Sequence, residues 1–390
     1  MNSNKDLLAN KKVAILVKTT LKFDGRVIAE IDTLAETHPN TTFKVFLLPD
    51  DNNAPISFAP NVSVIPINIF TRRFKFKKVL IPLTTLLYTI RCLGMVYRFK
   101  PDIIHVHDSF PLTVSSLYRL IRKCKVIYDD HELFIINPDL FHKGLYYLES
   151  KIYRTADKVL VANRHRKRIA QLIYKVPAEK IEVLENYNHV RNEVSEPFHD
   201  KPFEDLIRDG KNNGQVFILH QGVINEGRGL KYLLRIASSL PSHVKIVLMG
   251  ISGTRYQQLI AQYPELIAST INIGFKPYEH INKYWAAMDG ALVFYGIKQI
   301  NNKYCAPNRL YLGLSNAVPL LVNEENPVLS SSIEQHGAGL SIRMDNLSEV
   351  LHTFIDKVQN KEFYADSNSE FSFKAYSGPI LKKVYSEIIS

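Results

Sequence analysis

The chain has 390 residues, of which 46% are hydrophobic and 22% charged, a composition that excludes a disordered protein and exceeds what one ordinary core needs. We therefore predict two globular domains. The three cysteines (Cys92, Cys124 and Cys305) are too few and scattered for a disulfide framework, which predicts a reducing compartment such as the cytosol. The formal net charge of +11 indicates an anionic partner.

The first twelve residues contain no apolar stretch, so the sequence predicts no secretory leader. No run of about 18 uncharged apolar residues follows, which predicts no membrane-spanning helix.

Short apolar runs, most of them followed by a stretch of helix length, recur along the chain. In the first half, strands are predicted at Val13–Lys18, Phe43–Pro49, Val62–Ile67, Asp102–Asp108, Lys125–Asp130, Lys158–Asn163 and Ile181–Glu185. In the second half, they are predicted at Val216–Gly222, Val244–Gly250, Thr270–Phe275, Ala291–Tyr295, Val318–Asn323 and Gly339–Arg343. Apolar strands that alternate with helices predict an α/β fold with parallel sheets covered on both faces.

A polar stretch with four prolines and glycines, residues 191–214, interrupts this rhythm and is predicted to connect the domains. We predict an N-terminal domain at 1–190 and a C-terminal domain at 215–360, both doubly wound and Rossmann-like. In open α/β sheets, ligands bind beyond the carboxyl ends of the strands. Two such sheets that face each other would leave a binding cleft between them.

The loop that follows the first strand of the second domain is rich in glycine. Gly222, Gly227 and Gly229 permit tight turns just before a predicted helix, whose free N–H groups suit a phosphate. Arg228 adds a guanidinium fork that suits a pyrophosphate. The alternative is an ordinary strand-to-helix turn with a solvated arginine.

A second loop, Tyr304-Cys305-Ala306-Pro307-Asn308, precedes another predicted helix. Pro307 suits the first helical turn and Asn308 lies inside that turn, so free N–H groups would again face a ligand. A helix cap without any ligand is the alternative.

The strand at Lys125–Asp130 leads into His131. Strand alternation would place Asp130 and Glu132 on one face and His131 on the other, which argues against a metal site, and none is predicted. His131 could hydrogen-bond a transferred sugar or an acceptor hydroxyl, with a structural role as the alternative.

Two weaker signals complete the first domain. His107 and Asp108 end a strand and should lie on opposite faces, so that one of them could line the cleft. Asp24, Gly25 and Arg26 lie in the loop after the first strand, where Gly25 would permit close approach of a ligand.

Positive charge is concentrated between residues 66 and 127, where twelve lysines and arginines stand against two acids. The densest part contains aromatic residues between the cations Arg72, Arg73, Lys75, Lys77 and Lys78, and an apolar stretch follows it. This pattern suits the surface of an anionic bilayer, with a solvated basic helix face as the alternative. Nucleic acid shares the electrostatics, but no recognisable binding module is present and no nucleic-acid partner is predicted.

Several segments resemble those of GT-B glycosyltransferases, above all the retaining glycosyltransferase family 4. The most specific are residues 221–230, similar to "QG…GRGL", and residues 306–320, similar to "PNKLFEYLAAGLPV". Residues 23–27 resemble the family's "DPRV" loop, and residues 101–108, 127–134, 156–161 and 183–186 are similar to its first-domain segments.

The resemblance implies an enzyme that moves a sugar from a nucleotide-sugar donor, bound by the C-terminal domain, to a glycan or lipid-linked acceptor on the N-terminal domain. It implies no metal and no cofactor besides the donor. Arg228, Gly222, Gly229 and residues 304–308 would hold the diphosphate, Phe275 and Lys276 the base, and His131 would lie near the sugar. The terminal segment 361–390 is expected to cross back to the first domain.

Three departures from the family pattern leave alternatives open. Leu312 stands where the family has a glutamate that holds the donor ribose, and Ala317 stands where it has a glycine. The first carboxylate of its Glu-x7-Glu pair is also absent, with Asn301 and Asn302 nearby. The expected function is a glycosyltransferase of surface polysaccharide or glycolipid assembly, peripheral to the cytoplasmic face of a membrane. A non-catalytic sugar-nucleotide or partner-binding protein and a sugar-nucleotide 2-epimerase are the alternatives.

Overall fold

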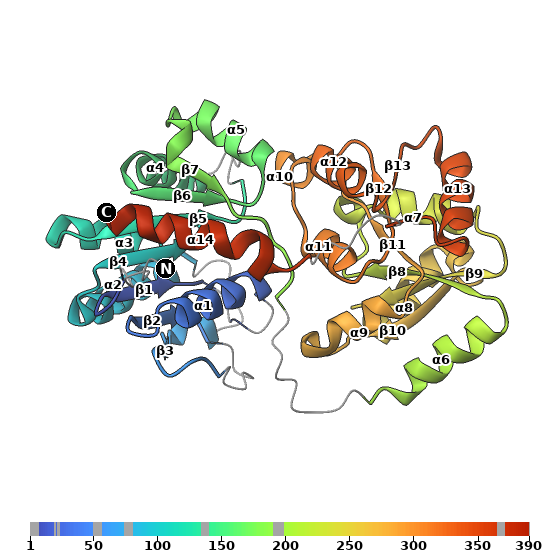
Figure 1. The fold of residues 1–390 in the computed structure, drawn as a ribbon, viewed down its shortest axis with the longest axis horizontal. Helices are drawn as coiled ribbons and strands as arrows, with labels where there is room; N and C mark the ends of the chain where they lie inside the picture. Colours follow the sequence, from blue (N-terminus) through green and yellow to red (C-terminus); the bar gives the residue numbers. More distant parts are fainter. Residues whose placement is uncertain are drawn as a thin grey trace, which may run out of the picture. The chain divides into compact units, whose positions relative to one another are not determined.

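The computed structural model describes residues 8–18, 21, 24–49, 57–73, 81–133, 140–189, 199–364 and 371–389. The chain divides into two compact units (Figure 1). Unit 1 comprises residues 1–189 and 373–390, and unit 2 comprises residues 190–372. The C-terminal residues therefore return to the first unit.

Within the described residues, unit 1 contains a seven-stranded parallel sheet in the order β3-β2-β1-β4-β5-β6-β7. Its strands are β1 (Lys12–Leu16), β2 (Thr42–Leu47), β3 (Val62–Pro66), β4 (Ile103–His107), β5 (Lys125–Asp130), β6 (Lys158–Val161) and β7 (Ile181–Val183). The order reverses at the β1–β4 pair, which is the type of position where doubly wound sheets bind ligands.

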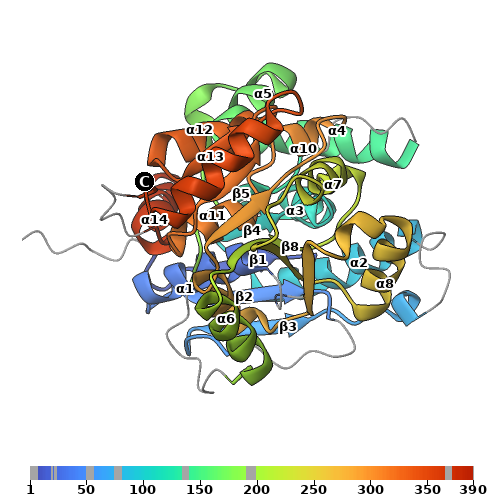
Figure 2. The same cartoon turned by 90° about the vertical axis from the view of Figure 1, so that its right-hand side faces the viewer.

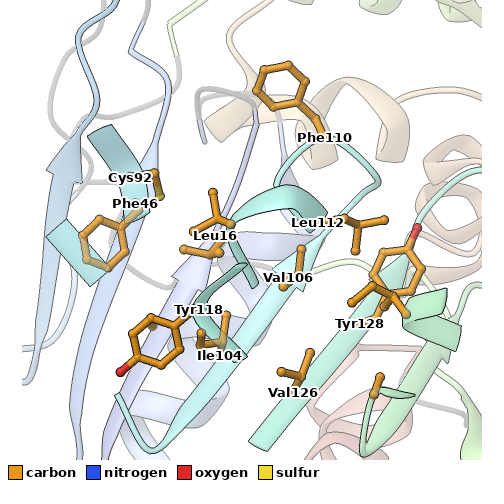
Figure 3. Packing of buried hydrophobic residues seen from close by; sticks show 14 of the residues in the cluster. Leu16, Phe46, Cys92, Ile104, Val106, Phe110, Leu112, Tyr118, Val126 and Tyr128 are labelled. Carbon is orange, nitrogen blue, oxygen red and sulfur yellow. The ribbon is translucent and has the colours of Figure 1, made fainter. Parts of the chain in front are cut away.

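Helices cover both faces of this sheet. They are α1 (Gly25–Thr37), α2 (Ile81–Phe99), α3 (Leu112–Ile121), α4 (Leu140–Thr155), α5 (Arg164–Tyr174) and α14 (Phe373–Ile389), with short 3-10 turns η2 (Phe70–Arg73) and η3 (Ala178–Lys180). Helices α2 to α5 pack on one face and enclose its main core. Figure 3 shows Cys92 of α2 and Leu112 and Tyr118 of α3 among the apolar side chains of β1, β4 and β5. Helices α1 and α14 lie side by side on the other face (Figure 1).

Unit 2 contains, in its described part, a six-stranded parallel sheet in the order β10-β9-β8-β11-β12-β13. Its strands are β8 (Val216–Gln221), β9 (Val244–Met249), β10 (Thr270–Gly274), β11 (Gly290–Val293), β12 (Leu320–Asn323) and β13 (Gly339–Ile342). Helices α7 and α8 lie on one side of β8, and α6 and α11 lie on the other (Figure 2).

The helices of unit 2 are α6 (Lys201–Asn212), α7 (Leu230–Ala237), α8 (Gly253–Gln262), α9 (Ile281–Ala286), α10 (Ile300–Lys303), α11 (Asn308–Ser315), α12 (Pro327–His336) and α13 (Leu347–Gln359). Short 3-10 turns are η4 (Glu226–Arg228), η5 (Pro264–Leu266) and η6 (Tyr278–His280). Helices α7, α8 and α13 enclose the main core of this unit against the sheet.

The predicted α/β class with two doubly wound domains is confirmed, and all thirteen predicted strands occur. Residues 191–214 were predicted to connect the domains, and α6, a helix that the sequence analysis did not predict, occupies residues 201–212 of this segment. Asp200 caps this helix at the Phe203 N–H, and Phe203, Ile207 and Gly210 are buried one helical turn apart. A narrow apolar face therefore folds a segment whose composition is polar. Among the described helices, none is long and apolar enough to cross a membrane.

The start of β13 constrains one glycine. Gly339 has φ +156°, and a Cβ built there would lie 1.9 Å from the backbone oxygen of Leu320 on the paired strand β12. No side chain fits without separation of the two strands.

We therefore expect Gly339→Ala to lower the free energy of unfolding by about 3 kcal/mol or more, because strain and collision add. The matched control is Gly214→Ala, which has φ +74° but open space around the new methyl group and should cost about 1 kcal/mol. Urea unfolding followed by circular dichroism measures both. Equal losses in the two variants would show that backbone conformation alone sets the cost.

Candidate functional site

In unit 2, two arginines flank one tyrosine near the carboxyl ends of the central strands. The guanidinium carbon of Arg228 lies 4.7 Å from the ring centroid of Tyr295, and that of Arg309 lies 5.0 Å from it. Arg228 Nη1 also donates to the Tyr295 hydroxyl, and Arg309 Nη1 donates to the backbone oxygen of Gln221 at 3.0 Å. Tyr295 follows β11 and Gln221 ends β8, so adjacent strands bring the two cations to one place.

Local hydrogen bonds hold the loops around this pair. The backbone oxygen of Gly227 accepts from Gly296 N at 3.1 Å and from Asn302 Nδ2 at 3.4 Å. The side chain of Asn323, at the end of β12, accepts from Tyr295 N at 3.0 Å and donates to Tyr295 O at 3.1 Å. The loop that carries Arg228 and the segment that carries Tyr295 are thus fixed to each other before any ligand binds.

Two glycines of the loop that follows β8 adopt backbone conformations that other residues rarely adopt. Gly222 and Gly229 have φ +97° and +80°, in the left-handed region, and a Cβ on Gly229 would lie 2.2 Å from Cβ of Phe294. Gly229 therefore permits close packing of the turn on β11 and precedes the first residue of α7.

The second predicted loop enters the same neighbourhood. Pro307 precedes α11 and Asn308 is its first residue, so the helix starts one residue later than the sequence prediction placed it. Asn326 Nδ2 donates to the backbone oxygen of Asn302 at 3.1 Å and lies 3.4 Å from Cys305 Sγ, which holds the segment at 304–306. Asn308 is exposed and Ala306 is buried. The helix that begins here carries Arg309 in its first turn.

Buried polar nitrogens near the arginines lack hydrogen-bond partners within the described part of the chain. They are Arg309 Nη2, which is a donor, and the two ring nitrogens of His220, the penultimate residue of β8, of which one is a donor and the other an acceptor in a neutral ring. Burial, followed by the charges of Arg309 and Arg228, lowers the pKa of His220 to about 3, so its ring is neutral. Unsatisfied buried donors next to two cations suit an anionic ligand that would complete their hydrogen bonds.

Phe275 and Lys276 follow β10, an edge strand separated from β8 by β9. Phe275 is 74% exposed. Lys276 Nζ pairs with Asp200, which also accepts from the Tyr284 hydroxyl at 2.7 Å. The structure therefore gives Lys276 an acidic partner that the sequence analysis did not foresee.

In unit 1, a buried arginine joins three elements. Arg26 Nε lies 3.0 Å from Asp129 Oδ2 and 3.1 Å from Glu30 Oε1, and its Nη2 donates to Asp129 Oδ1. Its Nη1 donates to Asn186 Oδ1 at 2.7 Å. A buried charge is tolerated only when it is paired in this way, so α1, β5 and the segment after β7 are bound together by one guanidinium.

His131 is the most exposed ring of this cluster, with 16% of its side chain accessible. Its Nε2 lies 2.9 Å from Asp129 Oδ2, and its Nδ1 lies 3.9 Å from Asp108 Oδ2. Burial alone would lower its pKa, but the carboxylates of Asp129 and Asp108 raise the pKa of His131 to about 10. His131 is therefore an imidazolium at neutral pH and acts as a hydrogen-bond donor, not as a general base.

The rings of His105 and His107, in the same cluster, stack with their centroids 4.3 Å apart. Burial, followed by the neighbouring His107, lowers the pKa of His105 well below its ordinary value, whereas burial and the charge of Asp129 raise the pKa of Glu30 well above its ordinary value. His105 Nε2 lies 3.7 Å from Glu30 Oε2, and the two pKa shifts favour the neutral form of each side chain. The hydroxyl oxygen of Tyr385, in α14, lies 2.9 Å from His105 Nδ1, and this hydrogen bond connects the C-terminal helix to the cluster.

Ligand atoms of Glu30, His105, His107 and Asp129 lie within 4.8 Å of one another and could in principle surround a metal ion. Arg26 already bonds both carboxylates, and His131 supplies a second positive charge. Side chains of the protein itself therefore already supply positive charge beside the Asp129 carboxylate.

The prediction that Asp130 and Glu132 lie on the same face of a strand was wrong, because the strand does not extend to Glu132. Strand β5 ends at Asp130, which is buried and accepts from the Tyr153 hydroxyl, while Glu132 is exposed. The two acids predicted to share a face therefore do not.

The structure brings Arg26, His107, Asp108 and His131 together. Asp108 has φ +61°, which turns the chain sharply at the end of β4. Asp24 caps α1 through Val27 N at 3.4 Å, and Gly25 is the first residue of α1. Of the membrane patch, Lys75, Lys77 and Lys78 lie outside the described residues, as do the side chains of Arg72 and Arg73.

The sequence analysis missed five residues of these sites: Glu30, His105, Asp129, Tyr295 and Arg309. The spacing of Arg26 and Glu30 by four residues and of Asp129 and His131 by two was available as a signal. The remaining partners come from separate elements and carry no local pattern.

The raised pKa of His131 gives a pH-dependent stability. A folded-state pKa above the unfolded value means that the contribution is fully present below about pH 6.5 and is lost as the pH rises through about 10. We expect His131→Gln to shift the urea midpoint of unit 1 strongly at pH 6 and little at pH 10. His189→Gln, at a half-buried histidine that pairs with Asp32 outside this cluster, is the control. Equal shifts of the His131 variant at both pH values would contradict the charged state.

Residues 34–187 match the family model described as Glycosyltransferase Family 4. No curated protein matches the chain. Among solved structures, sucrose-phosphate synthase from Thermosynechococcus elongatus is 13% identical with a TM-score of 0.69, covering 97% of this chain and 96% of that one. Anabaena HepE in complex with UDP-glucose is 14% identical with a TM-score of 0.67, covering 97% and 100%.

WaaG, a glycosyltransferase involved in lipopolysaccharide biosynthesis, is 14% identical with a TM-score of 0.66, covering 95% of this chain and 99% of that one. At these identities the structures establish the fold, and the family match covers residues 34–187 of unit 1. The chain therefore has the two-domain α/β fold of GT-B glycosyltransferases.

Proposed function

We propose that the chain transfers a sugar from a nucleotide-sugar donor to a glycan or glycolipid acceptor in surface polysaccharide assembly. The observation that carries this proposal is the pair Arg228 and Arg309, which both lie close to Tyr295, beside the unpartnered nitrogens of His220 and Arg309. Two guanidiniums and free N–H groups match a diphosphate better than a neutral sugar or a lipid chain.

The chemistry follows from where charge develops. When the sugar–phosphate bond breaks, negative charge accumulates on the leaving diphosphate. Cations fixed in advance by Tyr295 and Gln221 stabilise that charge without reorganisation. Gly222, Gly229 and the 304–308 segment would approach the phosphates with their backbone, and Phe275 and Lys276 would lie against the base.

On the acceptor side, His131 would donate a hydrogen bond to a sugar or acceptor oxygen, because it is protonated and is the most accessible ring of its cluster. Asp24, Gly25, Arg26, His107 and Asp108 would shape the acceptor site around it. Arg26 and Asp129 act as positioning residues, since they hold the imidazolium through the Asp129 carboxylate.

The proposal includes retention at the anomeric carbon and independence of metal. Support for the second comes from the sequence, which lacks an Asp-x-Asp pair, and from the arginines, which supply the positive charge that a metal would otherwise provide. UDP-sugars are the first donors to test, because the HepE structure contains UDP-glucose.

We propose that the enzyme works peripherally at the cytoplasmic face of a membrane with an anionic surface. The support is the basic segment around Arg72, Arg73, Lys75, Lys77 and Lys78, together with the likeness to WaaG.

A non-catalytic sugar-nucleotide-binding protein is a second candidate, because Leu312 is 2% exposed and can offer no ribose contact. A donor screen across UDP-, GDP-, ADP- and CMP-sugars separates the candidates. Turnover supports the transferase, binding without turnover supports the second candidate, and interconversion of the donor without acceptor supports an epimerase.

Removal of either arginine should impair turnover. We expect Arg228→Ala and Arg309→Ala each to lower kcat/KM about tenfold to a hundredfold, since a charged hydrogen bond is worth about 1.5–3 kcal/mol. Arg255→Ala, at an exposed arginine of α8 whose guanidinium donates to Gln258 of the same helix, is the matched control and should retain activity. Undiminished turnover in both site variants would refute the assigned diphosphate contacts.

Metal independence makes a separate prediction. Donor turnover should be unchanged when EDTA is added to metal-stripped enzyme and should not rise with Mg²⁺ or Mn²⁺. A large, saturable activation by either ion would disprove this part of the proposal.

A further inference from the structure

The outward side of α2 presents apolar residues at helical spacing. Leu83, Leu86, Ile90 and Tyr97 are exposed and fall three, four and seven residues apart, so they form one row along the helix. Leu86 and Ile90 are 55% and 59% exposed. The opposite side of the helix, with Cys92, is already buried against the sheet (Figure 3).

Helix α3 extends this surface. Leu117, Leu120 and Ile121 are exposed, and Leu120 reaches 77%. The Thr89 and Thr113 hydroxyls lie 2.7 Å apart, and Arg122 stacks on Tyr97 at 4.9 Å, so the two helices are directly adjacent. We call the exposed apolar residues of α2 and α3 the α2–α3 face. Clustered apolar side chains on a surface indicate an interaction site.

Positive charge borders the face. Neither helix contains an acidic residue, and residues 81–125 contain seven lysines and arginines against Asp102 and Asp108. The cations are Arg91, Arg98, Lys100, Arg119, Arg122, Lys123 and Lys125.

A cavity of about 540 Å³ opens beside the C-terminal end of α3, at the amino edge of the sheet. Its walls include five cations and one acid, Asp102, which pairs with Lys11 at 3.4 Å. The five cations are Lys11, Lys100, Arg122, Lys123 and Lys125. Ile103, Tyr118 and Ile388 supply apolar surface. The cavity therefore combines an excess of positive charge with an apolar wall.

We propose that the α2–α3 face is the surface that docks on an anionic bilayer, with the adjoining basic cavity taking the phosphate of a lipid headgroup. The apolar row enters the interfacial region of the lipid while the flanking cations meet the headgroups. This inference rests on the membrane association proposed above and assigns it to a surface in the described part of the chain. The cavity lies at the sheet edge opposite the strand ends that carry His107 and His131, so docking leaves that site uncovered.

A bilayer fits better than the other polyanions. Nucleic acid would use the cations but would leave Leu86, Ile90 and Leu120 in contact with water or phosphate. A bilayer surface offers apolar depth and negative charge together, in the geometry of an apolar row flanked by cations.

Three variants test the assignment. Leu86→Ser/Ile90→Ser/Leu120→Ser removes apolar contact, and Arg122→Glu/Lys123→Glu reverses charge at the cavity. Arg235→Glu/Arg255→Glu makes the same charge change on exposed residues of unit 2 and serves as the control. Each full-length protein is sedimented with phosphatidylcholine vesicles, with and without phosphatidylserine, at low and high salt, after circular dichroism has shown native folding.

We expect the wild type to bind the phosphatidylserine vesicles at low salt, and each of the first two variants to bind about tenfold or more weakly. The control variant has the same change in net charge as Arg122→Glu/Lys123→Glu. It should nevertheless bind within about twofold of the wild type, because its changed residues are not part of the α2–α3 face. Wild-type protein that does not sediment, or α2–α3 variants that bind as the control does, would overturn the proposal.

Inorganic phosphate and glycerophosphoserine distinguish the source of the phosphate. Should either bind the cavity in calorimetry and lose affinity in Arg122→Glu/Lys123→Glu, while vesicle binding stays unchanged, the cavity serves a free phosphate and the lipid assignment fails. Donor turnover in vesicle-free solution should be equal in all variants. Absence of turnover in the wild type would defeat the proposed function and leave the docking result standing.

Discussion

Parallel pairing of strands is the constraint on which both sites depend. When all strands of a sheet run the same way, every loop that follows a strand emerges at one edge, whatever its distance along the chain. In unit 1 this brings Arg26, at the start of α1, to the ends of β4 and β5. In unit 2 it brings Arg228, Tyr295 and Arg309 together although up to 81 residues separate them. The pairing of the apolar strands thus brings the polar residues of each site together at one edge of the sheet.

At those strand ends, burial and the neighbouring charges together set the pKa of each ionisable side chain. In unit 1, Asp129 accepts from both Arg26 and His131, and these cations outweigh burial and hold its pKa well below the ordinary value. For Glu30, burial and the charge of Asp129 outweigh the attraction of Arg26, and its pKa is raised. The pKa values of these two buried carboxyl groups therefore shift in opposite directions because their charged neighbours differ. The consequence is a fixed imidazolium at the accessible edge of the cluster.

In the described part of unit 2, by contrast, the positive charge of the two site arginines is not neutralised by an acidic partner. Within the described residues, Arg228 and Arg309 are held mainly by a tyrosine ring and by neutral oxygens, and neither guanidinium pairs with a carboxylate. A carboxylate would neutralise them and compete with an anionic ligand, whereas an aromatic face orients a guanidinium and leaves its charge in place. Lys276 shows the contrast, because its ammonium pairs with Asp200.

The α/β class, the thirteen strands and the loops with Gly222, Gly229 and Pro307 could be predicted from the residues alone, because hydrophobic period, β-branching and turn chemistry are local properties. The sequence analysis missed α6, whose apolar face is only three residues wide within a polar segment. Only the tertiary structure decided that Asp129 pairs with Arg26, that Arg309 joins Arg228 at Tyr295, and that the outer sides of α2 and α3 stay uncovered. Those relations depend on which strands become neighbours and on how deeply each charge is buried, and neither quantity is written in any short stretch of residues.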